Sequence, residues 1–452
     1  MIPNVLAARY ASSQMTALWS ADHKVVLERR LWIAVLKAQA SLGVDVPAGV
    51  VEAYEAVVDQ VDLASIERRE RVTKHDVKAR IEEFCALAGH QHVHKGMTSR
   101  DLTENVEQLQ VRQALELVRS RMVTVLARLS ERALEHRDTV IVERTHNVPA
   151  QASTLGKRFA NAGEELLQAF ARVDELLARY PLRGIKGPVG TQQDQLDLLG
   201  DHEKVDRLER LVAEHLGFAN VLHDVGQVYP RSLDLDVVSA LVQAASGPAN
   251  LAKTIRLMAG HDLATEGFLP GQVGSSAMPH KTNARSCERI NGFTVVLRGH
   301  LAMVADLVGD QWNAGDVSCS VVRRVALPDA FFALDGLFET FLTVLDGFGT
   351  FPAVIERELE RYLPFLATTK MLLSLVKQGH GREEAHQMVQ DWAASAATAI
   401  RNGAQPPAAA FEGTPMELVG AAPGQVEQFA DRVAALVDRF PSAAKYVPEE
   451  IL

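Results

Sequence analysis

The longest uninterrupted helical pattern in this sequence lies between Thr103 and Asp138, where there is neither glycine nor proline. Apolar residues recur there at three- and four-residue steps, which places them on one face of a helix. They are Leu115, Val118, Met122, Val125, Leu126 and Leu129. About 36 residues in one helix would span roughly 54 Å at 1.5 Å per residue. Such a helix is unusual in a compact domain, so the sequence predicts an extended helical bundle.

Three more stretches share this period. One follows Gly156, one covers residues 233–258, and one runs from about residue 284 to residue 309. We expect Pro248 to kink or break the second stretch, because proline removes a backbone donor and clashes with the preceding turn. Strand signals are confined to the run TVIV at 139–142. An all-α fold is therefore predicted.

At 452 residues the chain exceeds the size at which one core usually stops growing. Breaks in the helical pattern near 98–103 and 347–352 divide it into three predicted domains. Within the last, residues 383–401 should form a helix and residues after Gln405 a less regular tail. The predicted domains are an N-terminal helical domain (1–102), a central long-helix bundle with a loop at 267–283 (103–349), and a C-terminal helical domain (350–452).

Composition limits the partners and the compartment. The formal net charge is −10, so no overall field attracts nucleic acid or an anionic membrane. No apolar run approaches the roughly 18 residues that span a membrane. Cys85, Cys287 and Cys319 are widely separated and form no CxxC pair, which argues for a reducing compartment. We expect a cytoplasmic protein without nucleic-acid or membrane partners, whose cationic groups for any anionic ligand are local.

The stretch 267–283 combines glycines and prolines with reactive side chains and ends in GSSAMPHKTN. Composition alone would suggest a solvated surface loop. However, two serines and a lysine stand directly before a predicted helix, whose N-terminus offers N–H groups and a positive dipole end to an anion. The sequence resembles the mobile-loop motif GSSxMPxKxN of the fumarase/aspartase superfamily, in the AMPHK form typical of its adenylosuccinate lyase branch.

This resemblance implies that Ser275 is the catalytic base. A serine alkoxide needs nearby cations and N–H donors once water is excluded, and Lys281 and the loop amides would supply them. Lys281 would also neutralise the charge that develops on the substrate carboxylate as the β-proton leaves. Asn283, the last residue of the motif, is expected to bind substrate.

The segment ERTHNVPA at 143–150, followed by STLGK at 153–157, matches the family pattern RTHxxxA…TxGK. A lone histidine in a loop between helices would otherwise be interpreted as a solvated residue. The match puts His146 at the position of the general acid. Imidazole suits this role because its pKa near 6.5 lets it donate a proton to the leaving nitrogen near neutral pH.

The segment TKHDV at 73–77 is similar to the family's T-R-H-D-V, whose histidine and aspartate contact substrate. It assigns His75 a catalytic role and Asp76 a binding role; without the resemblance, the two would be a surface pair. Lys74 replaces the family arginine, which keeps the charge but loses the bidentate fork.

His94 matches the family's H-x-G-x-T-S-x-D, whose histidine lies in the active site and whose threonine and serine hold a substrate carboxylate, here Thr98 and Ser99. Two alternatives remain open. The alternating His90, His92 and His94 would share one face of a strand and could bind a metal, although no carboxylate or cysteine completes the ligand set. The segment TSRD could also be a plain helix N-cap.

Further matches favour a phosphorylated purine substrate. They are the pair Arg9–Tyr10, which resembles the family's phosphate-contacting R-Y element, Gln227 in GQVYPR as a substrate ligand, and Ser320 and Arg324 in DVSCSVVRR as phosphate or carboxylate ligands. The sequence departs from the family at Gly226, where the family has threonine, and at Gly315, where it has arginine. We expect Arg289 or Arg323 to take over the phosphate contact of that family arginine.

The resemblance covers most of the chain and implies a homotetramer built on a core of long helices, with sites drawing on three subunits. It implies fumarate release from adenylosuccinate, giving AMP, and from the succinylated carboxamide ribotide of purine synthesis, without metal or organic cofactor. One alternative is a relative acting on argininosuccinate, aspartate, malate or a carboxymuconate. Another is a catalytically silent helical scaffold, in which Ser275, Lys281 or His146 would be expected to be lost.

Overall fold

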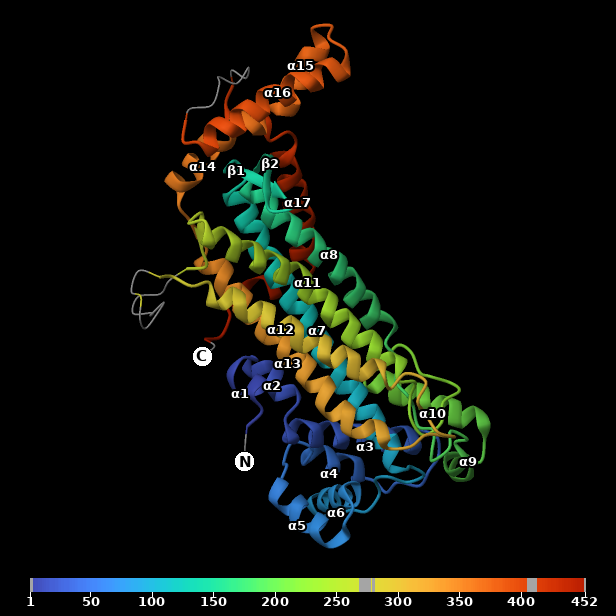
Figure 1. The fold of residues 1–452 in the computed structure, drawn as a ribbon. Helices are drawn as coiled ribbons and strands as arrows, with labels where there is room; N and C mark the ends of the chain where they lie inside the picture. The colour runs from blue at the N-terminus through green and yellow to red at the C-terminus, as the bar shows by residue number, and fades with distance from the viewer. Residues whose placement is uncertain (1–2, 268–277, 279–280, 405–412, 451–452) are drawn as a thin grey trace.

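The computed structural model describes residues 3–267, 278, 281–404 and 413–450. Five long helices form an elongated bundle along the length of the molecule (Figure 1). They are α7 (Ser99–Glu135), α8 (Leu155–Arg179), α11 (Ser232–Gly260), α12 (Arg285–Ala305) and α13 (Ser318–Gly347). The predicted all-α bundle is confirmed. No helix in the described residues combines the length and apolar character that a bilayer crossing requires.

Further helices gather at both ends of the bundle (Figure 1). At the lower end of the view lie α3 (Ala21–Ser41), α4 (Val50–Ala56), α5 (Leu63–Thr73), α6 (Asp76–Ala88), α9 (Gln193–Leu199) and α10 (His202–His215). The helices α1 (Val5–Arg9) and α2 (Ser13–Leu18) lie along the side of the bundle. At the upper end lie α14 (Pro352–Leu366), α15 (Thr368–Lys377) and α16 (Arg382–Arg401).

The strands form two small antiparallel sheets: β1 (Val140–Thr145) with β2 (Val148–Thr154), and β3 (Ala264–Thr265) with β4 (Gly349–Thr350). The strand predicted at 139–142 is confirmed as the start of β1. The chain then ends in the 3-10 turn η1 (Pro415–Leu418), the helix α17 (Ala422–Arg439) and the turn η2 (Ala443–Lys445).

The helix α7 is the centre of the core. It contacts α8, α13 and α17, and most of its apolar residues are buried, with Leu134 near its end exposed. It begins four residues before the predicted start and ends three residues before the predicted end. A capping box explains the early start, because the Asp101 carboxylate accepts the Thr98 N–H at 2.8 Å.

Of the kink or break expected at Pro248, the break is wrong, because α11 continues from Ser232 to Gly260. The backbone at Gly247 packs closely on α8, where a Cβ would lie 2.5 Å from the Ala162 carbonyl oxygen, and this packing offsets the hydrogen bond that the proline cannot make. The tail after Gln405 is not irregular throughout, because it contains the 18-residue α17.

Candidate active site

The loop that carries the GSSAMPHKTN motif starts from the sheet β3–β4 and ends at α12. Glu266 follows β3, and its carboxylate accepts the N–H groups of Ser286 and Cys287, both at 2.9 Å. A carboxylate at this place satisfies the first amides of α12 and its dipole. The start of α12 is thereby fixed against the beginning of the loop. Ser275, the predicted base, lies outside the described residues.

Lys281 and Asn283 line a cavity of about 570 Å³ next to α11 and α12. Lys253 and Arg256 of α11 add two further cationic groups to its wall. Sequence reasoning missed these two residues. Their signal was a pair of cations three positions apart, which lie on one face of a helix. Asp262 and Glu288 line the same cavity, and Arg256 lies 3.9 Å from Glu288, so Lys253 and Lys281 are the cations that an anionic ligand would meet there.

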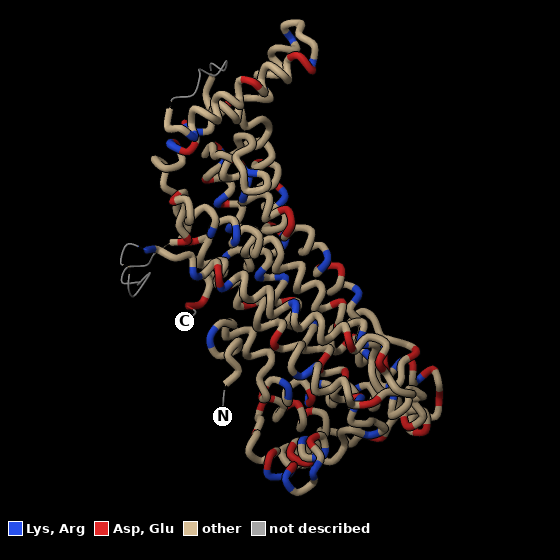
Figure 2. Tube along the Cα trace, in the orientation of Figure 1, with Lys and Arg blue, Asp and Glu red and all other residues tan. Residues whose placement is uncertain are grey.

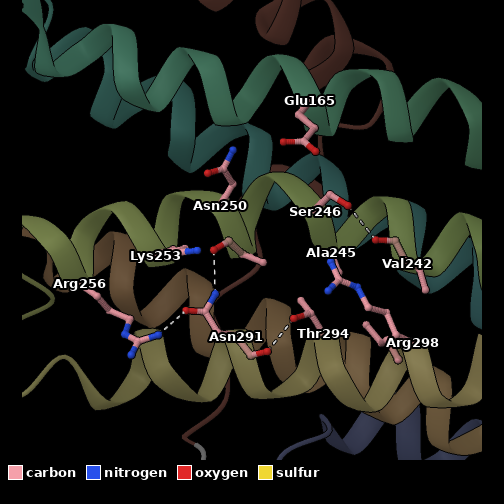
Figure 3. Close-up of a pocket in the computed structure, with 12 residues that line it drawn as sticks. Glu165, Val242, Ala245, Ser246, Asn250, Lys253, Arg256, Asn291, Thr294 and Arg298 are labelled. Atoms are coloured by element: carbon pink, nitrogen blue, oxygen red, sulfur yellow. Dashed lines mark hydrogen bonds between the residues drawn. The ribbon is translucent and has the colours of Figure 1, made fainter. Parts of the chain in front are cut away.

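A second groove, of about 450 Å³, lies between α8, α11 and α12 (Figure 3). Figure 3 shows Arg256 and Asn291 pointing toward one another across it. Arg256 donates to the Asn291 side-chain oxygen at 3.0 Å, and Asn291 donates to the Ala249 carbonyl at 2.8 Å. These bonds tie α12 to α11 in the second turn of α12 and so stiffen the wall that both hollows share.

Arg9, Tyr10 and Arg289 form one cluster. The Cζ atom of Arg9 lies 6.0 Å and that of Arg289 5.4 Å from the centre of the Tyr10 ring. Within the described residues neither guanidinium takes part in an ion pair. Two such groups repel one another unless an anion joins them, so the cluster suits a phosphate.

The helix α13 holds this cluster in place. Its Asp335 carboxylate accepts the Ser12 N–H at 2.6 Å, and burial raises the pKa of that carboxyl group. At Gly336 an added Cβ would lie 2.8 Å from the Tyr10 Cβ, so glycine allows the tyrosine to approach. A long helix and a short N-terminal segment, far apart in sequence, therefore position Tyr10 together.

His146 lies at the tip of the hairpin β1–β2, rather than in a loop between helices as expected. His146 and Asn147 have φ angles of +53° and +63°. Positive φ at both central residues defines the tight type I′ hairpin turn, in which asparagine is favoured. The imidazole is exposed, so the hairpin presents it outward from the chain.

Lys74 and His75 form the joint between α5 and α6. Lys74 ends α5 in the left-handed region, with φ +53°, and His75 caps α6 by accepting the Lys78 N–H at 3.2 Å. Both side chains are exposed. Asp76 is half-buried and lies 3.4 Å from Arg80. The cap occupies Nδ1 of His75, so a contact of this imidazole with substrate would have to use Nε2.

His94 is half-buried against Trp32, whose indole N–H donates to His94 Nδ1 at 3.0 Å. A neutral imidazole that accepts at Nδ1 carries its proton at Nε2. Burial lowers the pKa of His94, with the nearby Asp101 acting in the opposite sense. Residues 90–92 have no regular secondary structure and residues 93–96 form a turn, so the strand face proposed for three histidines is wrong. Within the described residues no cluster of His, Cys, Asp and Glu could hold a metal ion.

Thr98 and Ser99 start α7, and both are half-buried. Gln227 lies at the same end of the bundle, where its N–H donates to the Ala314 carbonyl at 2.6 Å. Gly315 follows, and an added Cβ there would lie 3.3 Å from the Gln227 Cβ. The glycine that replaces the family arginine thus lies against the predicted substrate ligand.

Ser320 and Arg324 lie in the first turns of α13, half-buried and exposed respectively. Arg323 is buried between them, and its guanidinium bonds to Asp234 at 2.7 Å and to Glu107. The charge of Arg323 is balanced by carboxylates inside the bundle and its side chain is buried, so we do not expect it to stand in for the family arginine that Gly315 replaces. Arg289 takes part in no ion pair among the described residues and is the better of the two candidates.

The chain does not bring all predicted site residues together. Thr98 and Ser99 precede α7 and the hairpin of His146 follows it, so the length of a 37-residue helix, about 55 Å, separates them. His94 and His75 interact electrostatically, which places them with the group at the start of α7. Arg9, Tyr10 and Arg289 form a separate cluster, and Lys281 and Asn283 line a separate cavity. Figure 2 shows basic and acidic residues interspersed along the described trace.

Comparison with known proteins identifies the family. A family model described as a lyase matches residues 8–299. The adenylosuccinate lyase of Saccharomyces cerevisiae is 34% identical over 406 residues, which cover 88% of this chain and 83% of that protein. That of Pyrococcus abyssi is 30% identical over 394 residues, covering 86% of each chain. That of Bacillus subtilis is 29% identical over 387 residues, covering 84% and 86%.

Solved structures agree on the fold. The 3-carboxy-cis,cis-muconate lactonizing enzyme of Pseudomonas putida superposes with a TM-score of 0.81 at 20% identity, over 96% of this chain and 100% of that chain. A fumarate lyase from a Mesorhizobium species superposes with a TM-score of 0.79 at 20% identity, over 94% and 98%. At this identity the likeness concerns the fold alone. The sequence matches go further, and the chain belongs to the adenylosuccinate lyase family of the lyases.

Proposed function

We propose that this protein is an adenylosuccinate lyase, which eliminates fumarate from adenylosuccinate to give AMP. We propose the same elimination for the succinylated carboxamide ribotide of purine biosynthesis. The observation that carries the assignment is the cluster of Arg9, Tyr10 and Arg289, because two guanidiniums that pair with no carboxylate of the described residues match the phosphate that both substrates bear. Lyases of unphosphorylated adducts have no need of it.

The proposed elimination uses side chains from separate segments of the sequence. In the proposed reaction Ser275 removes the β-proton of the succinyl group, the C–N bond breaks as the double bond of fumarate forms, and His146 protonates the departing nitrogen. Lys281 balances the charge that builds on the carboxylate. His75 and His94 would orient the succinyl group, Thr98 and Ser99 would hold its carboxylate, and the step needs no metal or organic cofactor.

Binding is assigned to the remaining side chains. The phosphate would lie between Arg9 and Arg289. The other proposed substrate ligands are Lys74, Asp76, Gln227, Asn283, Ser320 and Arg324. The cationic cavity at Lys281 supports this assignment, as does the exposure of Arg324 at the start of α13.

We further propose a homotetramer with composite sites, in which the three domains at 1–102, 103–349 and 350–452 each supply part of the site. The separation of Ser99 from the hairpin tip supports it, since one succinyl group cannot reach both in a single chain. Exposed apolar residues on the bundle, such as Val295 at 67% and Val321 at 71% exposure, offer faces for subunit contact. Three cysteines without disulfide support a cytoplasmic location.

The direct test follows fumarate release from adenylosuccinate by the purified protein. We expect turnover, with argininosuccinate, aspartate and malate giving none. Replacement of Ser275 or His146 by alanine should lower the rate by at least about two orders of magnitude, the usual contribution of a positioned acid or base. His202→Ala, which changes an exposed histidine on α10, is the matched control and should keep full activity. Activity in Ser275→Ala or His146→Ala close to wild type would remove that residue from the mechanism.

A further inference from the structure

Arg183 is a fully buried arginine between α8 and the glycine-rich segment 184–190. Its guanidinium donates to the Asp101 carboxylate at 2.7 Å. It also donates to the carbonyl oxygens of Gly184 and Gly187, each at 3.2 Å, and to that of Gly226 at 2.9 Å. One side chain therefore bonds to the start of α7, to the glycine-rich segment and to the residue before Gln227.

Asp101 is the second member of this group of contacts, which we call the junction and which joins Thr98, Asp101, Arg183 and Gly226. One oxygen of its buried carboxylate accepts the Thr98 N–H at 2.8 Å. The other accepts the N–H groups of Lys186 at 2.8 Å and Gly187 at 3.0 Å, together with the Arg183 bond. Both oxygens are occupied and out of contact with solvent, so the carboxylate acts on its neighbours rather than on a ligand.

The junction fixes the distance between two segments that the proposed function places on the substrate. Thr98 is joined to Asp101, Asp101 to Arg183, and Arg183 to Gly226, the neighbour of Gln227. On the far side Gly226 has no room to move, because an added Cβ would lie 2.2 Å from the Ala314 carbonyl oxygen. A planar guanidinium with several directed donors holds such a geometry, whereas the point charge of a lysine does not.

We propose that Arg183 and Asp101 are a positioning pair, which sets the spacing between Thr98–Ser99 and Gln227 and thereby the affinity for the succinyl part of the substrate. The inference rests on the proposed function and deepens it. Neither residue touches substrate. The alternative is a purely structural ion pair, which would stabilise the fold and leave substrate binding alone.

Arg183→Lys tests the pair, because it keeps the charge and removes the fork. With adenylosuccinate as substrate we expect KM to rise about tenfold or more, while kcat falls by less than about threefold, since binding is lost in ground and transition state alike. Loss of folded protein alone would lower the apparent kcat and leave KM unchanged. An unchanged KM in folded Arg183→Lys protein overturns the proposal.

Arg29→Lys is the matched control. Arg29 is also buried, pairs with Glu83 at 2.6 Å and donates to the carbonyl oxygens of Val57 and Val58, both at 2.9 Å. The substitution removes the same kind of fork from the N-terminal helices. We expect a loss of thermal stability comparable with that of Arg183→Lys and an unchanged KM. An equal rise of KM in both variants would overturn a specific role for Arg183.

If Arg183→Lys does not fold, amide hydrogen exchange of the wild-type protein tests the same proposal. Added fumarate should slow amide hydrogen exchange in the peptides around residues 98–101 and 225–228 together with the segment 184–187, because that segment holds no proposed ligand and is bonded to both members of the pair. Protection of the two ligand peptides without the segment 184–187 would overturn the proposal. Protection of one peptide without the other, or of neither, overturns the proposal. Failure of the proposed function is distinguishable, since it appears as a wild-type protein that releases no fumarate from adenylosuccinate.

Discussion

The position of Arg289 is set by the helix that carries it and by the ring of Tyr10 that it faces. It lies on the first turns of α12, whose start Glu266 fixes, and it faces the ring of Tyr10 together with Arg9. The chain lacks the family arginine at Gly315, and Arg323 is committed to buried carboxylates. Arg289 is therefore the residue whose charge has the most to contribute to phosphate binding.

Replacing Arg289 by alanine should raise KM for adenylosuccinate about 10- to 100-fold, since a hydrogen bond to a charged group contributes roughly 1.5–3 kcal/mol. The measurement compares the nucleotide with its dephosphorylated nucleoside. The nucleoside should bind wild type and Arg289→Ala equally weakly, because the interaction at issue is with the phosphate. An equal loss of affinity for both ligands would show that Arg289 acts on the fold or on the succinyl group.

Among the elements, the hairpin shows how far sequence reasoning reaches. The β-branched run at 139–142 indicated its first strand, and the motif singled out His146. The tight turn was missed, although an asparagine directly after His146 is the residue that a type I′ turn favours. Local signals identified the parts of the site one by one. The long helix predicted between Thr103 and Asp138 already implied that Thr98 and His146 lie far apart in one chain. Local signals could not show which distant segments meet, such as Tyr10 and Gly336 of α13.

The helix α17 was missed for a different reason. Val426, Phe429, Val433 and Leu436 recur at helical steps and are buried against the bundle. A less regular tail after Gln405 was expected from the sequence, and this helix was not singled out. The helix α17 is stabilised by its packing against α7 and α8, and this packing is not visible in the sequence.

One glycine lets α17 dock. At Gly163 of α8 an added Cβ would lie 2.1 Å from the Phe429 ring, so Gly163→Ala should lower the free energy of unfolding by about 1–3 kcal/mol through overpacking. Gly424, in the first turn of α17, has nothing within 4 Å of such a Cβ. There the same substitution should leave stability unchanged or raise it by up to about 1 kcal/mol. Denaturant unfolding of both variants measures the contrast, and equal effects would contradict this account of the packing.

At the scale of the whole molecule, the length of α7 determines whether one chain can form a complete site. The group at His75, His94 and Thr98 lies at one end of the bundle, and the hairpin of His146 lies at the other (Figure 1). If both groups act on one succinyl group, they must come from different subunits. A site that is shared in this way can be rebuilt from two defective chains, provided that each chain carries the group that the other lacks.

Subunits of His75→Ala and His146→Ala, each expected to be inactive alone, should regain activity when assembled together. In a random equal mixture, about a quarter of the sites would receive an intact His75 from one chain and an intact His146 from another. A chain with both substitutions, mixed with either single variant, is the control and should stay inactive. Differently tagged chains would verify that mixed oligomers form. Mixed oligomers that release no fumarate would contradict the shared site. Since the 37-residue α7 separates His75 from His146 in one chain, that result would mean that the two histidines do not act on the same substrate molecule.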